Sequence, residues 1–308
     1  MKKMASIFPG QGSQCFGMGK DFYDSSDVAK EMIDAASDRV GFGFTSLMFE
    51  ENDNLEKTEF TQPAIFLVSA IAHKLFENEM SIKPIFSLGH SLGEFSALES
   101  VGALDYLDGV ALVHQRGQLM AEACKGVDVG MMAILGMSDE DVEALTNAER
   151  KNGKKIWPAN YNSDGQIVVA GAKPDLSIMI DAFKEAGAKR AILLNMSIAS
   201  HCPLLEAAVP PLKVSLEKYL KDEFIAPVVS NVTAKKYASK AEAIDLLAQQ
   251  LTKPVMYKHS IKAFEDEIEL HIEFGGSVLK GLNRRGVKNP TISVTDMQSL
   301  ESAFSELS

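Results

Sequence analysis

The chain has 308 residues, of which 46% are hydrophobic and 24% are charged, and its formal net charge at pH 7 is −11. This composition is typical of a globular protein with a buried core, and the length allows one large domain with a smaller one attached. The negative charge argues against nucleic acid as the main partner, because phosphate binding requires a basic surface.

The cysteines and the apolar segments indicate the compartment. The three cysteines are Cys15, Cys124 and Cys202. Their spacing matches neither a metal site nor a disulfide framework, so we expect no metal and a reducing environment. The longest apolar run, residues 64–72, is too short to span a bilayer, and the run at residues 4–8 is too short for a signal peptide. The sequence therefore predicts a cytoplasmic protein without membrane contact.

The first part of the chain predicts alternating strands and helices. Residues 5–8 are expected to form a short buried strand, followed by a glycine-rich loop, and residues 65–76 a largely apolar helix. Residues 85–88 are a second short apolar run, and a helical pattern begins after Gly93. A strand, a tight turn and a helix in succession are typical of α/β proteins.

Residues 131–196 predict a different order of elements. Strands are expected at residues 131–135, 156–159, 167–170 and 191–194, and helices at 138–150 and 175–186. Ser138 is expected to cap the first helix, Gly187 to follow the second, and residues 162–165 to form the turn between the two middle strands. The resulting order, strand–helix–strand–strand–helix–strand, is the ferredoxin-like pattern.

We therefore predict an α/β fold with two domains. A large α/β-hydrolase-like domain with a parallel sheet comprises residues 1–127 and 198–308, and a small ferredoxin-like α+β domain at residues 128–197 is inserted into it. In the second part of the large domain, helices are expected near residues 203–221 and 240–251, and a strand at residues 270–274.

The segment Gly89-His90-Ser91-Leu92-Gly93 matches the G-x-S-x-G pattern of a nucleophile elbow. In such an elbow a sharp turn from strand to helix exposes the serine, and the flanking glycines leave room for the turn. The serine then lies at a helix N-terminus, whose free N–H groups favour a developing oxyanion. The apolar run before the motif and the helix after it favour Ser91 as a nucleophile over a plain glycine-rich turn.

A nucleophilic serine needs a base, and His201 is the strongest candidate among the six histidines. It follows a predicted strand and lies in a loop, which is a common position for a catalytic residue, although a structural role is the alternative. The other histidines fit other roles, since His90 is expected to point away from Ser91. Two lie in helical patterns, one in a polar stretch and one in a strand: His73, His114, His259 and His271. No acid stands out as a third member of a triad, so either a backbone carbonyl orients His201 or the protein is not an ordinary hydrolase.

The loop after the first strand offers a second backbone site. Gly10 and Gly12 allow the backbone at Gln11 to approach a ligand closely. A dinucleotide-binding loop is the alternative, but the third glycine of that motif is missing and Pro9 interrupts the turn.

A series of motifs follows one another in the same order as in a known family. They are FPGQGSQ at 8–14, TQPA at 61–64, GHSLGE at 89–94, RGQLM at 116–120, NYNS at 160–163, GQIVVAG at 165–171, SHC at 200–202, SNVTA at 230–234, QL at 250–251, PV at 254–255 and EFGG at 273–276. Over nearly the whole chain, the set resembles the malonyl-CoA:acyl carrier protein transacylases.

The resemblance implies a ping-pong acyl transfer. Ser91 would attack the thioester of malonyl-CoA with His201 as general base, and coenzyme A would leave. The phosphopantetheine thiol of acyl carrier protein would then attack the malonyl-serine ester. The resemblance implies no cofactor, because coenzyme A is only the carrier of the substrate.

The resemblance also assigns roles around these two residues. The backbone N–H groups of Gln11 and Leu92 would form the oxyanion hole, and the backbone carbonyl of Gln250 would orient the histidine. Arg116 would hold the malonyl carboxylate, to which a guanidinium can donate two parallel hydrogen bonds. By its helical pattern alone, Arg116 is more typical of an exposed or ion-paired residue. Gly117 beside it indicates the close approach of another backbone or of a ligand, because glycine inside a helix costs about 1 kcal/mol relative to alanine.

The expected partners are malonyl-CoA and an acyl carrier protein. Carrier proteins of this family are acidic, so a chain with a net charge of −11 should bind one through a local basic patch. We place this patch at Lys189 and Arg190, at the end of the small domain, and at Arg284 and Arg285, on a helix after Gly275-Gly276. An ordinary solvated surface is the alternative for each pair. We expect a monomer.

Two departures from the family and three other functions remain open. Ile198-Ala199-Ser200 precedes the histidine where many members have Pro-Phe, and Ala-Ser-His occurs in relatives that take branched malonyl units, so extender selectivity stays open. Gly275-Gly276 replaces Gly-Pro, for which we expect a local loop effect. A serine esterase or thioesterase would not need Arg116, and a non-catalytic module that binds acyl carrier protein would not need both Ser91 and His201. A polyketide-type acyltransferase domain would be expected to have flanking modules, for which the sequence gives no sign.

Overall fold

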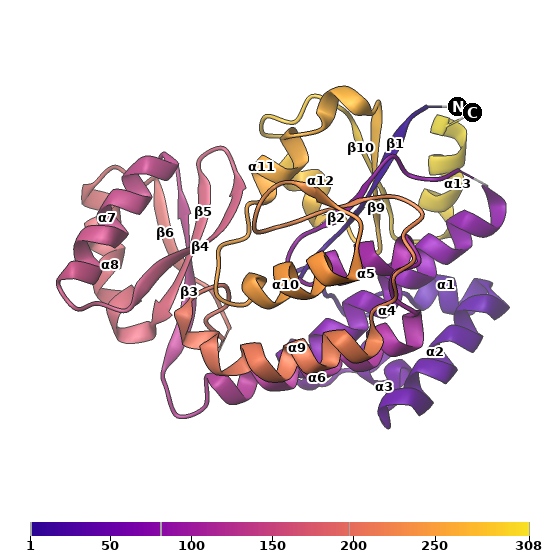
Figure 1. The fold of residues 1–308 in the computed structure, drawn as a ribbon, viewed down its shortest axis with the longest axis horizontal. Helices are drawn as coiled ribbons and strands as arrows, with labels where there is room; N and C mark the ends of the chain where they lie inside the picture. The colour runs from indigo at the N-terminus through magenta and orange to yellow at the C-terminus, as the bar shows by residue number, and fades with distance from the viewer. Residues whose placement is uncertain (1, 81, 197, 308) are drawn as a thin grey trace.

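Two β-sheets organise the chain in the computed structural model, which describes residues 2–80, 82–196 and 198–307. The larger sheet and most of the helices form one unit, and the smaller sheet with two helices forms a second unit beside it (Figure 1). Residue 197, the last residue of the predicted small domain, lies outside the described residues, as do the first and last residues of the chain.

The large sheet has the strand order β10-β9-β1-β2-β7-β8. Its strands are β1 (Met4–Phe8), β2 (Ser87–Gly89), β7 (Val228–Val229), β8 (Lys236–Tyr237), β9 (Leu270–Phe274) and β10 (Thr291–Val294). All of its described pairings are parallel except that of β7 with β8. The prediction of a parallel α/β sheet is thus confirmed, with an antiparallel strand at one edge that was not predicted.

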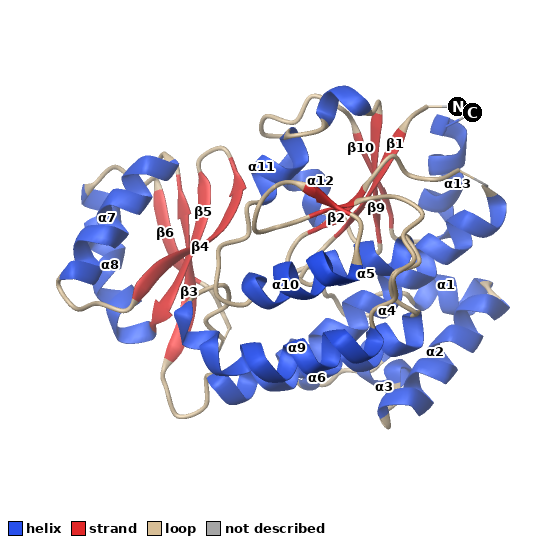
Figure 2. Ribbon diagram, in the orientation of Figure 1, coloured by secondary structure: helices blue, strands red, loops and turns tan. Residues whose placement is uncertain are grey.

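Helices cover both faces of this sheet (Figure 2). They are α1 (Lys20–Ser25), α2 (Asp27–Val40), α3 (Phe44–Phe49), α4 (Thr58–Glu79), α5 (Gly93–Ser100), α6 (Tyr106–Ala123), α9 (Val209–Tyr219), α10 (Lys240–Gln250), α11 (Tyr257–Lys262), α12 (Val278–Asn283) and α13 (Met297–Leu307). Short 3₁₀ turns lie at Asn54–Glu56, Pro203–Ala208 and Glu265–Glu267.

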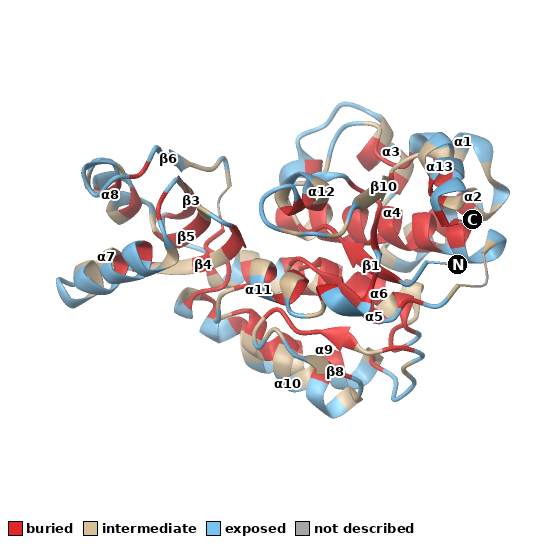
Figure 3. Ribbon diagram, turned by 90° about the horizontal axis from the view of Figure 1, so that it is seen from above, coloured by how far each residue is buried: buried red, intermediate tan, exposed pale blue. Residues whose placement is uncertain are grey.

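The central strand β1 is mostly apolar because it is buried on both of its faces. Its alternate side chains point to opposite faces, as the pleat of a strand requires. Met4 and Phe8 pack in the core formed with α4 and α6, and Ala5 and Ile7 pack in the separate core under α11 and α12. Figure 3 shows that the buried residues of the chain are concentrated along the strands and on the sides of the helices that face them.

The small sheet has the order β4-β5-β3-β6, with antiparallel pairings, which is the ferredoxin-like arrangement. It consists of β3 (Val129–Leu135), β4 (Ile156–Ser163), β5 (Gln166–Ala172) and β6 (Arg190–Leu193), with helices α7 (Asp139–Lys151) and α8 (Lys173–Glu185). Ser138 caps α7 as predicted, because its side chain accepts a hydrogen bond from the backbone N–H of Asp141. The predicted turn at residues 162–165 is too long. Asn162 and Ser163 belong to β4, and the turn is Asp164-Gly165, where Gly165 has φ 70°.

Helix α4 begins seven residues before the predicted helix, because Pro63 lies inside it rather than before it. Proline lacks the N–H that would bond the carbonyl of Glu59. That carbonyl instead lies 2.6 Å from Nδ1 of His114 on α6, which donates to it. The carbonyl that the proline leaves without its helical hydrogen bond is therefore satisfied by a side chain from the neighbouring helix.

Gly117 allows α6 to contact the start of α4. A Cβ at this position would lie 2.6 Å from Cα of Glu59 and 2.8 Å from the carbonyl oxygen of Thr58. The close neighbour expected from the sequence is thus a backbone and not a ligand.

We expect Gly117→Ala to lower the free energy of unfolding by about 1–3 kcal/mol, because overpacking outweighs the better helix propensity of alanine. Gly281→Ala is the matched control, since a Cβ there has no described atom within 4 Å and the residue is exposed on α12. The Gly281→Ala variant should have the same free energy of unfolding as the wild type or a slightly higher one. Chemical denaturation measures both, and equal effects at the two sites would contradict the packing argument.

The two units are joined along one edge of the small sheet. Val255 forms a parallel bridge with Asn160 of β4, through hydrogen bonds of 2.8 Å to the carbonyl of Ala159 and 2.9 Å from the N–H of Tyr161. Ion pairs add to this contact, since Lys258 on α11 lies 2.5 Å from Asp139 and Lys262 lies 2.8 Å from Asp164.

Candidate active site

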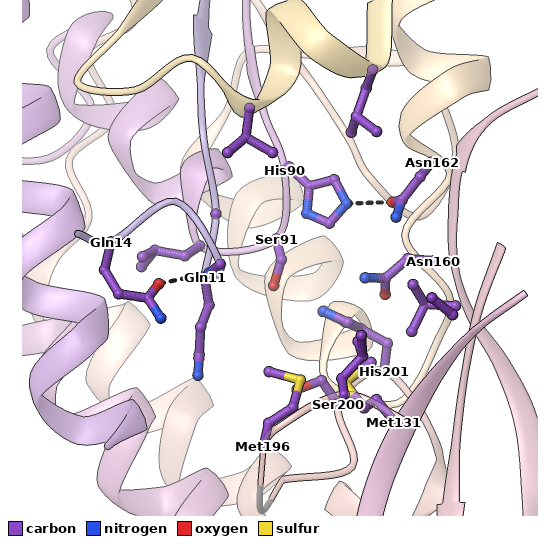
Figure 4. A pocket seen from close by; sticks show the side chains of 18 of the residues that line it. Gln11, Gln14, His90, Ser91, Met131, Asn160, Asn162, Met196, Ser200 and His201 are labelled. Atoms are coloured by element: carbon purple, nitrogen blue, oxygen red, sulfur yellow. Dashed lines mark hydrogen bonds between the residues drawn. The ribbon is translucent and has the colours of Figure 1, made fainter. Parts of the chain in front are cut away.

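A cavity of about 410 Å³ lies between the two units. The loop after β1, the turn after β2, helices α6 and α12, and strands β3, β4 and β5 contribute residues to its wall. Ser91, His201 and Gln11 line it (Figure 4), and Leu92 and Arg116 line it as well. The fold therefore brings five of the six residues assigned to the chemistry into one cavity, and the sixth, Gln250, is bonded to His201.

Ser91 lies on a sharp turn between β2 and α5. Its φ is 54°, a left-handed conformation that costs energy for a residue other than glycine. The flanking glycines are required for packing. A Cβ on Gly89 would lie 1.9 Å from the carbonyl carbon of Gly93, and a Cβ on Gly93 would lie 2.1 Å from the carbonyl oxygen of Phe8. These contacts are those of a nucleophile elbow, as the pattern predicts.

His201 is also in a left-handed conformation, with φ 59°. Its Nδ1 lies 2.6 Å from the backbone carbonyl of Gln250. A carbonyl only accepts, so Nδ1 carries the proton and Nε2 has a free lone pair. Burial, with a further contribution from the charge of Arg116, lowers the pKa of His201 to about 3. The ring is therefore neutral near pH 7 and able to accept a proton at Nε2.

Arg116 is fully buried, with 1% of its surface exposed, so the exposed position that its helical pattern favours is wrong. Nη1 donates to Oε1 of Gln62 at 2.7 Å, and Nη2 donates to Oε1 of Gln250 at 3.0 Å and to Oγ of Ser91 at 3.2 Å. Burial lowers the pKa of Arg116 to about 10, so it remains charged near pH 7. A guanidinium is thus held against the candidate nucleophile.

Glu94, the buried acid behind the elbow, offsets this charge. Its carboxylate accepts hydrogen bonds from the backbone N–H of Asn231 at 3.0 Å, from Nε2 of Gln250 at 2.8 Å and from the hydroxyl of Tyr237 at 3.0 Å. Burial raises its pKa to about 7, and these hydrogen bonds and Arg116 oppose the rise. The sequence reasoning assigned no role to Glu94, although the residue follows directly on the elbow motif.

The backbone N–H groups of Gln11 and Leu92 are available to a ligand. Within residues 2–80, 82–196 and 198–307, neither group donates a hydrogen bond to the protein. The side chain of Gln11 is held in place, since Thr58 Oγ1 donates to its Oε1 at 2.8 Å. Two free donors on the wall of a cavity beside Ser91 fit an oxyanion hole.

His90 contributes a contact between the two units. Its Nε2 donates to Oδ1 of Asn162 on β4 at 2.7 Å, and Figure 4 shows the ring directed to that side chain. The expectation that His90 is directed away from Ser91 thus agrees with the structure. His73 packs against the rings of Phe8 and Phe274, and His271 is buried in β9, so neither reaches the cavity.

The four residues of the predicted docking patch do not line the cavity. Lys189 precedes β6 and Arg190 is its first residue, and both are exposed. Arg284 and Arg285 are exposed as well, but they follow α12 and do not lie on it as predicted, because the helix ends at Asn283. Residues of α12 itself do line the cavity, so the second pair lies close to its wall.

The part of the chain that the structure describes shows neither a metal site nor a membrane-spanning helix. No group of three or more His, Cys, Asp or Glu side chains in that part of the chain is arranged to hold a metal ion. None of its helices is long and apolar enough to cross a membrane.

Comparison with known proteins agrees with this geometry. Residues 6–299 match the acyl transferase domain family. The malonyl CoA-acyl carrier protein transacylases of Bacillus subtilis and Escherichia coli K12 are similar to the chain at 38% and 36% identity, over 100% of this chain and 98% and 100% of theirs.

Solved structures give the same result. A malonyl-CoA:acyl carrier protein transacylase from Helicobacter pylori superposes with a TM-score of 0.96 at 45% identity, covering 100% of this chain and 99% of the other. A type II PKS acyl-carrier protein in complex with its malonyl-transacylase gives a TM-score of 0.94 at 35% identity, with 99% of both chains covered. By its sequence, its fold and its cavity, this chain belongs to the malonyl-CoA:acyl carrier protein transacylase family of acyl transferases.

Proposed function

We propose that the protein transfers the malonyl group of malonyl-CoA to the phosphopantetheine thiol of acyl carrier protein, through a malonyl ester of Ser91, and so supplies fatty acid synthesis. The observation that carries this proposal is the fully buried guanidinium of Arg116, 3.2 Å from the hydroxyl of a serine on a nucleophile elbow. An acyl group that bears a free carboxylate can use both residues at once.

The first half-reaction forms the ester. Oγ of Ser91 attacks the thioester carbonyl while Nε2 of His201 takes its proton, and the N–H groups of Gln11 and Leu92 bind the oxyanion. The tetrahedral intermediate then expels the coenzyme A thiolate, which receives the proton from His201. A C–O bond has formed, a C–S bond has broken, and the histidine is neutral again.

The second half-reaction runs the same steps in the other direction. The thiol of acyl carrier protein gives its proton to Nε2 of His201 and attacks the ester carbonyl, and Ser91 leaves with that proton. No oxidation or reduction takes place, so the proposed reaction uses no cofactor. The backbone carbonyl of Gln250 holds the ring of His201 in one tautomer throughout. It takes the position that the acid of a catalytic triad would have, which explains why no third acid was found in the sequence.

Arg116 is proposed to bind the malonyl carboxylate. In the free enzyme its Nη groups are bonded to neutral amide and hydroxyl oxygens, while Nε has no partner among the described residues. A carboxylate is a stronger acceptor than either amide, so it can compete for these donors. A serine esterase would have no use for this buried charge. The cytoplasmic location, the monomeric state and the division into domains at residues 128–197 stay predictions.

Intact-mass analysis after mixing with malonyl-CoA tests the function. We expect the mass to increase by one malonyl group, to remain increased when coenzyme A is removed, and to return to the initial value when acyl carrier protein is added. An esterase would release malonate without carrier protein. The proposal is wrong if the wild-type protein forms no adduct.

The docking patch gives a separate prediction for the second half-reaction. Reversing the charges of Lys189, Arg190, Arg284 and Arg285 should raise the KM for acyl carrier protein and leave the KM for malonyl-CoA nearly unchanged, because rim charges mainly steer the association of large partners. Lys221→Glu, at another exposed position, serves as the control. Steady-state kinetics with each substrate varied in turn measures both constants, and an equal rise for both substrates would count against docking at this patch.

A further inference from the structure

The side chain of Asn231 forms hydrogen bonds with the backbone at both ends of the turn that carries Ser91. It lies after β7 in the motif Ser230-Asn231-Val232 and is fully buried. Its Oδ1 accepts from the backbone N–H of Ser91 at 2.6 Å, and its Nδ2 donates to the backbone carbonyl of Gly89 at 2.6 Å. One side-chain amide thus pairs with the backbone on either side of His90, as a neighbouring strand would.

The orientation of this amide is fixed by its partners. The N–H of Ser91 can only donate and the carbonyl of Gly89 can only accept, so the oxygen and nitrogen of Asn231 cannot be exchanged. The backbone of Asn231 is held in turn. Its N–H donates to Glu94 at 3.0 Å, and its carbonyl accepts from the N–H of Met256 at 2.7 Å.

This pairing stabilises the strained backbone conformation of Ser91. With φ 54°, Ser91 is in a conformation that residues with a side chain rarely adopt, and such conformations persist only where their surroundings hold them. The pairing also occupies the N–H of Ser91. The first free N–H at the start of α5 is then that of Leu92, which the proposed oxyanion hole uses.

From these contacts we infer that Asn231 is the positioning residue of the nucleophile: it holds Ser91 in its left-handed conformation and directs its hydroxyl and the N–H of Leu92 into the cavity. Asn231 does not line the cavity and so does not contact the substrate there. This role rests on the proposed function, since it acts on the formation of the malonyl ester. It predicts a slower chemical step with unchanged substrate binding.

The first test is the rate of malonyl-serine formation in Asn231→Ala, followed in a single turnover by rapid quench and intact mass. We expect the rate constant to fall by about 10²-fold, because misplacing a reacting group by about 1 Å can cost that much. The Kd for malonyl-CoA, measured in a Ser91→Ala background, should stay within about threefold, since binding contacts are kept.

Asn283→Ala is the matched control for the loss of a buried asparagine. Asn283 lies on α12, is also buried, accepts from the hydroxyl of Tyr257 at 3.0 Å and donates to Thr291 at 3.0 Å. We expect a comparable drop in its thermal unfolding midpoint and no change in the rate of ester formation. If Asn231→Ala acylates at the wild-type rate while the wild-type protein forms the adduct, the inference is overturned. If the wild-type protein forms no adduct, the proposed function fails instead.

A second variant, Asn231→Asp, has nearly the same shape and gives a pH signature. An ionised aspartate cannot donate to the carbonyl of Gly89, whereas a protonated one can, and it still accepts from Ser91. The carboxylate of Glu94 beside it favours the protonated form.

The rate of Asn231→Asp relative to wild type should therefore rise severalfold as the pH falls from about 8 to 6. Taking the ratio at each pH removes the titration of Arg116, His90, His201 and Tyr237, which is common to both proteins, whereas Glu94 contacts residue 231 and titrates together with the introduced aspartate. A ratio that does not change with pH, at a rate equal to the wild type, would overturn the inference even if Asn231→Ala fails to fold.

Discussion

Ser91→Ala should abolish the malonyl adduct, and His201→Ala should slow its formation by on the order of 10³-fold or more. The serine supplies the only oxygen that the proposed ester can use. The histidine is neutral and has a free Nε2, because the carbonyl of Gln250 bonds its Nδ1 and burial lowers its pKa to about 3. Without this base, the hydroxyl is a weak nucleophile.

Intact mass under single-turnover conditions measures both effects. Ser215→Ala is the matched control, because this serine on α9 is buried and donates a hydrogen bond to Gln115 at 2.9 Å, but does not line the cavity. Its adduct should form at the wild-type rate. A malonyl adduct that still accumulates on Ser91→Ala would show that the nucleophile is wrongly assigned.

The second large effect is expected for Arg116→Ala, which should lose most malonyl transfer and keep, or gain, activity on acetyl-CoA. Acetyl has no carboxylate, so it does not need the guanidinium. Removing one partner of a buried charged pair typically costs about 2–5 kcal/mol of binding free energy. The variant also leaves the Oε1 atoms of Gln62 and Gln250 without their donor, so its folded fraction must be measured alongside.

The ratio of kcat/KM for malonyl-CoA to that for acetyl-CoA is independent of the folded fraction and is the decisive quantity. We expect it to fall by at least tenfold in Arg116→Ala, since about 1.4 kcal/mol corresponds to a factor of ten. Arg116→Lys keeps the charge but not the planar fork, and it should give an intermediate ratio. If both substrates lose the same factor, Arg116 is structural, and an esterase becomes the better explanation.

The parts of the site that were predicted have local causes. The elbow is set by the contacts that two glycines allow, so five consecutive residues are enough to identify it. The ferredoxin-like order follows from patterns within one segment, and its strands differ from prediction by only a few residues. Gly117 was correctly linked to a close neighbour, because the cost of glycine in a helix is also local.

The parts that were missed depend on distant contacts. Three buried polar residues could equally well lie on a surface by their sequence alone: Gln62, Glu94 and Asn231. Only the packing of α4, α5 and the segment after β7 around Arg116 buries them. Arg116 itself was expected to be more typical of the surface for the same reason. Helix α4 extends beyond the predicted residues 65–76, and it can include Pro63 because the distant His114 satisfies the freed carbonyl.

The bridge between Val255 and β4 determines how the cavity can open. A motion of the small sheet that separates β4 from Val255 would break the hydrogen bonds of Val255 with Ala159 and Tyr161, and it would displace the next residue, Met256, whose N–H donates to the carbonyl of Asn231. Widening the cleft would therefore disturb the turn that holds the nucleophile. We therefore expect the flexible arm of a carrier protein to enter without such a motion, past Val278, which lines the cavity and is 44% exposed.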